Sequence, residues 1–113
     1  MCMIISKNDL VRINKGFGGS LRHDASLDFA LDQQNNHKLG HYKKLAYLWR
    51  ALLVDHVFSD GNKRTAMLVA LAFADEHKKL AHRDLLLHHT LAIASKNIAN
   101  IRQIEWRLKN AIQ

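Results

Sequence analysis

Apolar residues recur along this 113-residue chain every three to four positions, which is the spacing of amphipathic helices. No segment outside one glycine-rich stretch suggests a strand, and proline is absent from the chain. We therefore predict an all-α fold, a compact bundle of about six helices. The expected helices cover residues 6–16, 26–33, 42–54, 62–76, 84–95 and 100–112.

Four of these helices are expected to begin at a side chain that often caps a helix N-terminus. The candidates are Ser6, Ser26, Asp84 and Asn100. Trp49 lies on the apolar face of the third helix, so we predict that its ring is buried in the core. The last helix carries a long and regular apolar stripe, which either completes the bundle or serves as a docking surface, and we favour completion of the bundle.

The helix over 62–76 is expected at the centre of the bundle. Its residues 66–74 are apolar in unbroken succession, and a helix that is apolar on all sides has to lie in a core. This run is much shorter than the roughly 20 residues that cross a bilayer. A chain of this length usually forms one domain, so we assign residues 1–113 to a single domain around a buried central helix.

The composition is that of a globular protein with a strong positive charge. The net charge is +7 and the pI is near 9.9, which favours an anionic partner such as a nucleotide, a nucleic acid or an acidic protein. The basic residues are scattered, so most of them are expected on solvated faces. The single cysteine, Cys2, excludes an internal disulfide, and no signal-like apolar stretch follows Met3–Ile5. We expect a cytoplasmic protein with no membrane partner.

The chemistry of the chain is concentrated in the ten residues from His56 to Thr65, at the start of the central helix. The first backbone N–H groups of a helix have no intrahelical partner, and with the helix dipole they favour anions. Gly61 allows the backbone to turn tightly and to approach a ligand. Lys63 and Arg64 add two positive charges, which indicates a site for several phosphates.

Three further side chains fit a reaction at a bound phosphate. Asp60 would repel phosphates, so we expect a hard divalent cation, best Mg²⁺, between the carboxylate and the phosphates. His56 can accept a proton from an attacking hydroxyl near neutral pH. Phe58 alternates with these two residues and is predicted to anchor the loop in the core. A lone histidine at a helix end is usually structural, but the neighbours of His56 favour a catalytic role.

From His56 to Arg64 the chain resembles the signature of the Fic/Doc family. That signature runs His, any residue, Phe, any residue, Asp or Glu, Gly or Ala, Asn, Gly or Lys, Arg. The resemblance implies a helical fold in which His56 is the general base and Asp60 holds Mg²⁺. It also implies that the phosphates of ATP bind the loop amides and the residues Gly61, Asn62, Lys63 and Arg64.

In this family a flap upstream of the signature holds the target protein in an extended, strand-like pairing. The resemblance implies such a flap in the glycine-rich stretch. It would consist of Phe17, Gly18, Gly19, Ser20, Leu21 and Arg22. The alternative is that this stretch is only a flexible connector between two helices.

Two departures from the commonest Fic pattern indicate the Doc (death-on-curing) branch. Lys63 stands where most Fic enzymes have Gly, and Met67 stands where they have a second Arg. The Lys63 side chain fills room that the inner phosphates need for adenylyl transfer, whereas in the Doc branch the γ-phosphate is presented. We predict a toxin that phosphorylates a protein. The alternatives are a Fic-type adenylyltransferase and a non-catalytic basic nucleic-acid-binding module.

The resemblance also implies the partners. The target protein supplies a Ser, Thr or Tyr hydroxyl, and a translation elongation factor is one such target. Many Fic proteins inhibit themselves through a Ser or Thr followed four residues later by Glu. The two glutamates of this chain follow Ala72 and Ile101 at that spacing, so this motif has no match. Control by a separate antitoxin protein is therefore expected, and nucleic acid is not the expected partner.

Overall fold

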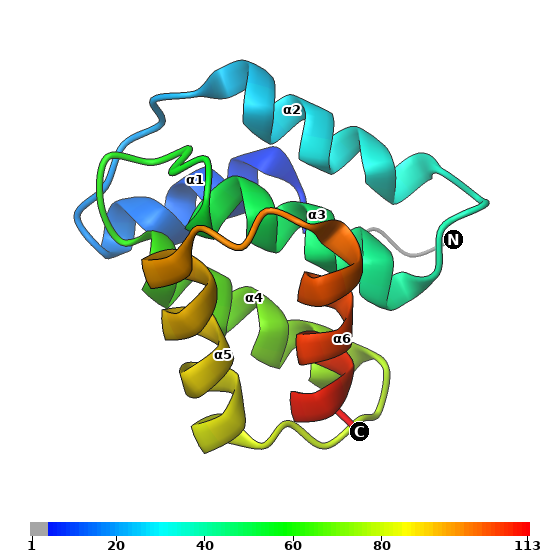
Figure 1. The fold of residues 1–113 in the computed structure, drawn as a ribbon. Coiled ribbons are helices and arrows are strands. Elements are labelled where there is room, and N and C mark those ends of the chain that lie inside the picture. Colours follow the sequence, from blue (N-terminus) through cyan, green and yellow to red (C-terminus); the bar gives the residue numbers. More distant parts are fainter. Residues whose placement is uncertain (1–4) are drawn as a thin grey trace.

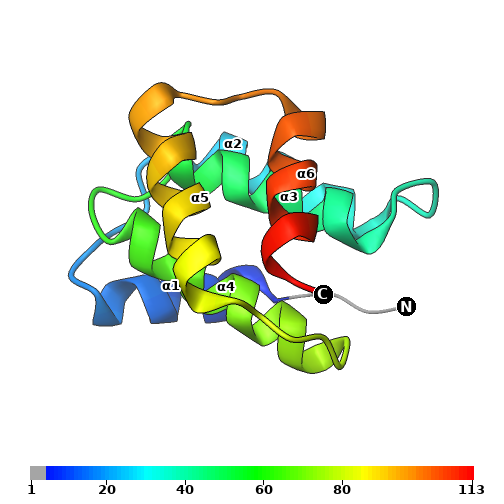
Figure 2. The ribbon, with the colours of Figure 1, turned by 60° about the horizontal axis from the view of Figure 1, so that its bottom comes forward.

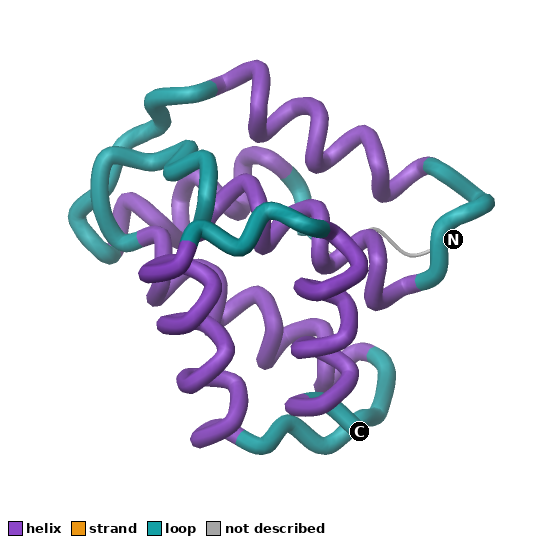
Figure 3. Tube along the Cα trace, in the orientation of Figure 1, coloured by secondary structure: helices purple, strands orange, loops and turns teal. Residues whose placement is uncertain are grey.

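The computed structural model describes residues 5–113, which fold into six α-helices without a strand (Figures 1 and 3). The helices are α1 (Lys7–Gly16), α2 (Asp24–Asp32), α3 (His41–Leu53), α4 (Asn62–Glu76), α5 (Arg83–Lys96) and α6 (Ile101–Ala111). A short 3₁₀ turn, η1 (Gln33–Asn35), follows α2. The prediction of a compact all-α fold with six helices is confirmed.

Helix α3 holds the bundle together. It packs against α2, α4 and α6, while α4 packs against α1, α3 and α5. Figures 1 and 2 show α5 and α6 side by side, joined by a loop that crosses one end of the pair. The last helix therefore completes the bundle, as its apolar stripe predicted.

The core is built from the apolar faces of all six helices. Its largest fully buried side chains include Trp49 of α3 and Phe73 of α4, and the indole Nε1–H of Trp49 donates to the Ala66 carbonyl at 3.0 Å. The predicted burial of Trp49 is confirmed. The expectation that α4 is buried on all sides is only partly correct, because Leu68 is 40% exposed. The apolar run of α4 therefore extends beyond the core to the surface of the bundle.

The predicted helix caps are correct at two helices and wrong at two. The side chains of Ser6 and Asn100 each accept a hydrogen bond at 3.1 Å from the backbone N–H three residues later. Ser26 and Asp84 lie inside the first turns of α2 and α5 and cap neither helix. Both helices begin earlier, after His23 and His82, whose main-chain carbonyls accept the first intrahelical bonds and whose side chains form no cap.

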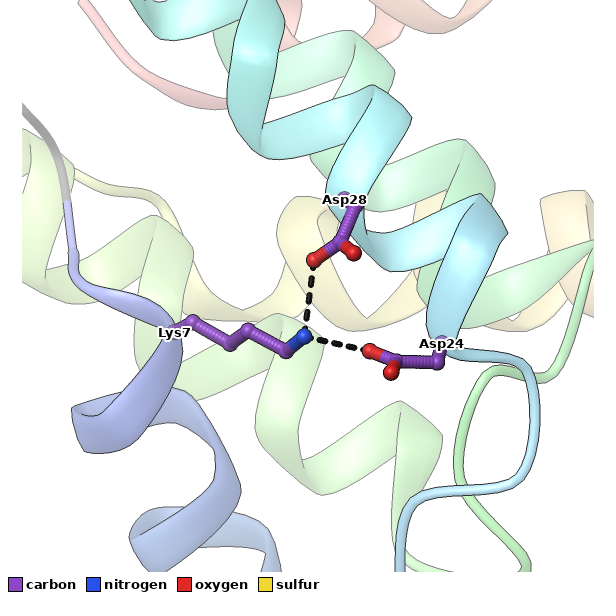
Figure 4. Close-up of polar contacts among 3 residues, drawn as sticks. All are labelled: Lys7, Asp24 and Asp28. Carbon is purple, nitrogen blue, oxygen red and sulfur yellow. Dashed lines mark hydrogen bonds and ion pairs between the residues drawn. The ribbon is translucent and has the colours of Figure 1, made fainter.

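Helices α1 and α2 are joined at the surface by a branched ion pair. The Lys7 ammonium group donates to the carboxylates of Asp24 and Asp28, the latter at 2.8 Å (Figure 4). The hydrogen bond to Asp24, followed by that to Asp28, raises the pKa of Lys7 above its ordinary value. The ion pair brings together the two helices that flank the glycine-rich stretch.

None of the helices in the described part of the chain is both long enough and apolar enough to span a membrane.

Candidate active site

The N-terminal end of α4 opens into a cavity of about 460 Å³. Side chains and backbone from four regions line it: the end of α1, the end of α3 with its following loop, the start of α4, and α5. The lining residues are Phe17, Leu53, His56, Ser59, Asp60, Gly61, Asn62, Lys63, Arg64 and Ala94. The cavity thus brings together the predicted general base, the predicted metal ligand and the four predicted phosphate-binding residues.

His56 is exposed and faces this cavity from the loop after α3. Its backbone is left-handed, with φ of 51°, a conformation that is uncommon for a residue with a side chain. The chain reverses here, since Asp55 N–H donates to the Arg50 carbonyl and Val57 N–H donates to the Ala51 carbonyl. A strained backbone that turns an imidazole into a cavity is typical of functional sites.

The loop between His56 and α4 is closed by Asn62. Its side-chain Nδ2–H donates to the Phe58 carbonyl at 2.9 Å, and its Oδ1 accepts from the Phe58 N–H at 3.2 Å. Phe58 itself is 1% exposed, in the core, and does not line the cavity. The oxygen and one N–H of the Asn62 side-chain amide are therefore engaged within the loop, and its backbone N–H makes no bond in the described chain.

The first turn of α4 presents backbone donors. Gly61, the residue before the helix, has φ of +71°, and a Cβ at this position would lie 2.8 Å from Phe17 Cβ. Within residues 5–113, the backbone N–H groups of Asn62, Lys63 and Arg64 donate to no protein acceptor, whereas Thr65 N–H closes the first turn on the Gly61 carbonyl at 2.9 Å. Three adjacent free N–H groups at a helix start form an anion-binding site.

Two cations stand beside these donors. Lys63 and Arg64 are exposed at the cavity, and in the described part of the chain neither forms an ion pair with a carboxylate. Met67, where most Fic enzymes have a second Arg, is half-buried outside the cavity, and its Sδ accepts from the Thr90 hydroxyl of α5 at 3.3 Å. The positive charge facing the cavity from α4 therefore comes from two side chains.

Asp60 is the acidic side chain at the cavity. Its Oδ1 accepts from the Gly61 N–H at 2.7 Å, and the residue is exposed. No group of three or more His, Cys, Asp or Glu side chains that could hold a metal ion exists among residues 5–113. One exposed carboxylate beside free N–H groups that can bind phosphate fits Mg²⁺. This ion commonly binds one or two carboxylates, waters and substrate phosphates rather than an all-protein cage.

The predicted flap pairs with the signature loop. Leu21 and Phe58 form an isolated antiparallel bridge, in which Ser59 N–H donates to the Ser20 carbonyl at 2.8 Å and Arg22 N–H donates to the Val57 carbonyl at 2.7 Å. In such a pair the N–H and C=O of Leu21 itself point away from Phe58. The segment is thus extended and leaves one edge open, although Phe17 is its one residue at the cavity.

One residue beside the site, Asn14, was not predicted from the sequence. Asn14 of α1 is fully buried, and its Nδ2–H donates to the Asp60 carbonyl at 2.8 Å and to Thr65 Oγ1 at 3.2 Å. It lies 46 residues from Asp60 and belongs to no pattern with the signature. The available signal was weak: an asparagine sits where an amphipathic helix would bury an apolar residue, four positions after Leu10.

The fold and this site define a helical domain in which a helix start with free N–H groups and an exposed histidine line one cavity. The chain matches the model of the Fic/DOC family over residues 7–74, which is more than half of its length, and it belongs to that family. Members are usually transferases that modify proteins, typically with ATP and Mg²⁺. No curated protein sequence and no solved structure is significantly similar to the chain.

Proposed function

We propose that this protein is a Doc-like toxin that transfers the γ-phosphate of ATP to a hydroxyl group of a protein target. One observation carries the proposal: an exposed histidine and an unpaired anion-binding helix start line the same cavity. We further propose that residues 1–113 act as one Fic/Doc-like domain.

In the proposed complex the triphosphate lies across the start of α4. The free N–H groups of Asn62, Lys63 and Arg64 donate to phosphate oxygens, and the two side-chain cations neutralise their charge. Gly61 contributes by the absence of a side chain, since a Cβ would crowd both the loop and Phe17. Mg²⁺ would be held by Asp60 together with the phosphates, and when bound it offsets their negative charge.

His56 then acts as the general base. The acceptor hydroxyl oxygen forms a bond to the γ-phosphorus while the bond from that phosphorus to the bridging oxygen of the β-phosphate breaks, and ADP leaves. The hydroxyl proton passes to the imidazole of His56. The left-handed backbone at His56 and its position on the cavity support this role.

The side chains at positions 63 and 67 favour phosphate transfer over adenylyl transfer. Lys63 occupies room at the cavity that a glycine would leave open for inner phosphates. Met67 has an uncharged side chain, and its sulfur contacts Thr90 of α5. Lys63 and Met67 therefore favour a nucleotide orientation in which the γ-phosphate faces the acceptor hydroxyl.

The target is proposed to bind along the open edge of the flap. The outward N–H and C=O groups of Leu21 can pair with one extended residue of a target segment, as in strand addition to a sheet edge. Arg22 follows at this edge and is exposed. We propose a translation elongation factor as the target and a separate antitoxin protein as the inhibitor.

Labelled nucleotides test the reaction. Incubation of the protein with a cell extract and Mg²⁺ is expected to transfer label to a protein from γ-labelled ATP and not from α-labelled ATP. His56→Ala should abolish the transfer while the circular dichroism spectrum is unchanged, and His37→Ala, at an exposed histidine away from the cavity, should not alter it. Transfer of label only from α-labelled ATP would contradict the kinase proposal and would indicate an adenylyltransferase.

A second variant tests the reading of Lys63. Lys63→Gly is expected to gain AMP transfer, because it restores the space that adenylyl transfer needs. Lys38→Gly, in a turn remote from the cavity, controls for loss of one charge. AMP transfer by the unaltered protein would contradict this reading.

The non-catalytic alternative makes a different prediction. A basic nucleic-acid-binding module would bind RNA or DNA with an affinity that falls steeply with salt and is unaffected by His56→Ala. Absence of label transfer together with such binding would favour that alternative.

A further inference from the structure

We infer that Asn14 is the positioning residue of this site, because it orients both the Asp60 carboxylate and the first phosphate-binding N–H group. The inference rests on the proposed function for its ligand, MgATP, but not for its geometry. Asn14 itself does not line the cavity. It acts through the two peptide groups on either side of Gly61.

The first branch runs through the peptide between Asp60 and Gly61. Asn14 Nδ2–H holds the Asp60 carbonyl at 2.8 Å. In a trans peptide the C=O and N–H groups point in opposite directions, and no peptide bond in the described chain is cis. The Gly61 N–H is thereby directed away from Asn14, and it donates to Asp60 Oδ1 at 2.7 Å. Asn14 thus fixes the carboxylate that is proposed to hold Mg²⁺.

The second branch runs through Thr65. The same amide donates to Thr65 Oγ1 at 3.2 Å, and the Thr65 hydroxyl donates to the Gly61 carbonyl at 2.8 Å. The Thr65 N–H donates to the same carbonyl at 2.9 Å, so the hydroxyl adds a second bond to the peptide that directs the N–H of the next residue, Asn62, the opposite way. That N–H is the first of the three free donors at the start of α4.

Asn14 also connects this loop to the flap. Its main-chain carbonyl accepts from the N–H groups of Phe17 at 2.9 Å and Gly19 at 3.2 Å. The target-binding and nucleotide-binding segments therefore meet on one buried residue.

The unsatisfied half of the amide supports a role beyond packing. Asn14 Oδ1 is buried and has no hydrogen-bond partner in the described chain. A buried polar atom without a partner is destabilising, and an apolar side chain of similar size would avoid that penalty. An apolar side chain, however, could not donate the two hydrogen bonds that the Asn14 amide makes to Asp60 and Thr65.

Four variants test this assignment by calorimetric titration with MgATP. Asn14→Ala removes both donors, and we expect MgATP binding to weaken by about tenfold or more, as for other supporting residues behind a metal or phosphate site. Thr65→Val interrupts the second branch alone and should weaken binding less. Thr65→Ser keeps the hydroxyl and should restore affinity to within about twofold of the unaltered protein. Asn8→Ala, at an exposed asparagine of the same helix, should have no effect.

Amide hydrogen exchange at Gly61 and Thr65, whose N–H groups are hydrogen-bonded within this loop and first turn, provides a second readout without nucleotide. Asn14→Ala should speed exchange at both amides, with circular dichroism showing that the variant is folded at the temperature used. Unchanged exchange and unchanged MgATP affinity in folded Asn14→Ala would overturn the inference, as would equal losses in Thr65→Val and Thr65→Ser. If the unaltered protein binds no MgATP, the proposed function fails, and the exchange rates alone decide whether Asn14 holds the loop.

Discussion

Gly19 is the position where the smallest substitution should disturb the site most. A Cβ at Gly19 would lie 2.2 Å from Asn14 Oδ1 and 2.3 Å from the Asp60 carbonyl oxygen. Both oxygens lie inside van der Waals contact, so both, or Gly19 itself, would have to move by about 1 Å. Gly19→Ala is therefore expected to separate the flap from the loop that Asn14 holds.

The size of the effect follows from this geometry. Overpacking of a buried contact costs about 1–3 kcal/mol. Relief by movement of the Asp60 carbonyl instead breaks its bond to Asn14 and leaves a buried donor unpaired, which costs about 1–3 kcal/mol. We expect the free energy of unfolding to fall by about 2–3 kcal/mol, which for a chain of this length lowers the Tm by about 8–13 °C.

Gly16→Ala is the matched control. It is the same chemical change, three residues away at the end of α1, and a Cβ there meets nothing within 4 Å. The two substitutions restrict the unfolded chain equally, so their difference reports on the folded state. We expect Gly16→Ala to leave the Tm unchanged or to raise it by up to about 4 °C, because alanine favours a helix over glycine by up to about 1 kcal/mol.

The assay is thermal unfolding of both variants followed by circular dichroism, with MgATP titration at a temperature where both are folded. Gly19→Ala should also weaken MgATP binding relative to Gly16→Ala. Equal Tm values for the two variants would refute the close approach of Gly19 to the loop. They would also refute the contact that joins the flap to the proposed nucleotide site.

Three further changes test the parts of the fold that support the site. Trp49→Phe should lower the free energy of unfolding by about 1–3 kcal/mol, because the indole bond from α3 to the Ala66 carbonyl is lost; unchanged stability in urea unfolding would contradict that bond. Asn100→Ala should cost about 1 kcal/mol as a lost helix cap, and Asn100→Asp should restore most of it. The pKa of Lys7 is raised in the folded state, so its ion pairs stabilise the fold at pH values below the unfolded pKa near 10.5. This contribution is lost as the pH rises through the folded pKa. In Lys7→Met the free energy of unfolding, measured as a function of pH, should not show this loss.

Much of the fold was predictable because each helix has a local pattern of apolar residues in the sequence. The apolar period indicated all six, and α4 begins and ends at the predicted residues, since Gly61 and the polar loop end the preceding structure within a few positions. Errors arose where main-chain carbonyls start a helix without help from a side chain. Ser26 and Asp84 have the right chemistry for a cap, but α2 and α5 had already begun.

The candidate site was predictable to the extent that its groups are adjacent in the chain. One loop and one helix turn carry His56, Asp60, Lys63 and Arg64. These residues are close in space because they are close in the sequence, so their positions at one cavity depend little on how the other helices pack. The direction of the Asn62 amide was not predictable in the same way. Its alternatives, toward a ligand or back to the loop, have the same sequence spacing, and the fold favours the bonds to Phe58.

The order of charges, caps and apolar positions was enough to predict a helical protein with a candidate phosphate site at a helix start, because each of these features depends on neighbours within a few residues. The packing of α1 and α5 around that helix start was not encoded in any local pattern. It places Phe17, Ala94 and the buried Asn14 beside a loop more than 30 residues away in sequence. Contacts of that kind exist only once the helices have packed, since a hydrogen bond between distant residues depends on where the whole core holds its two partners.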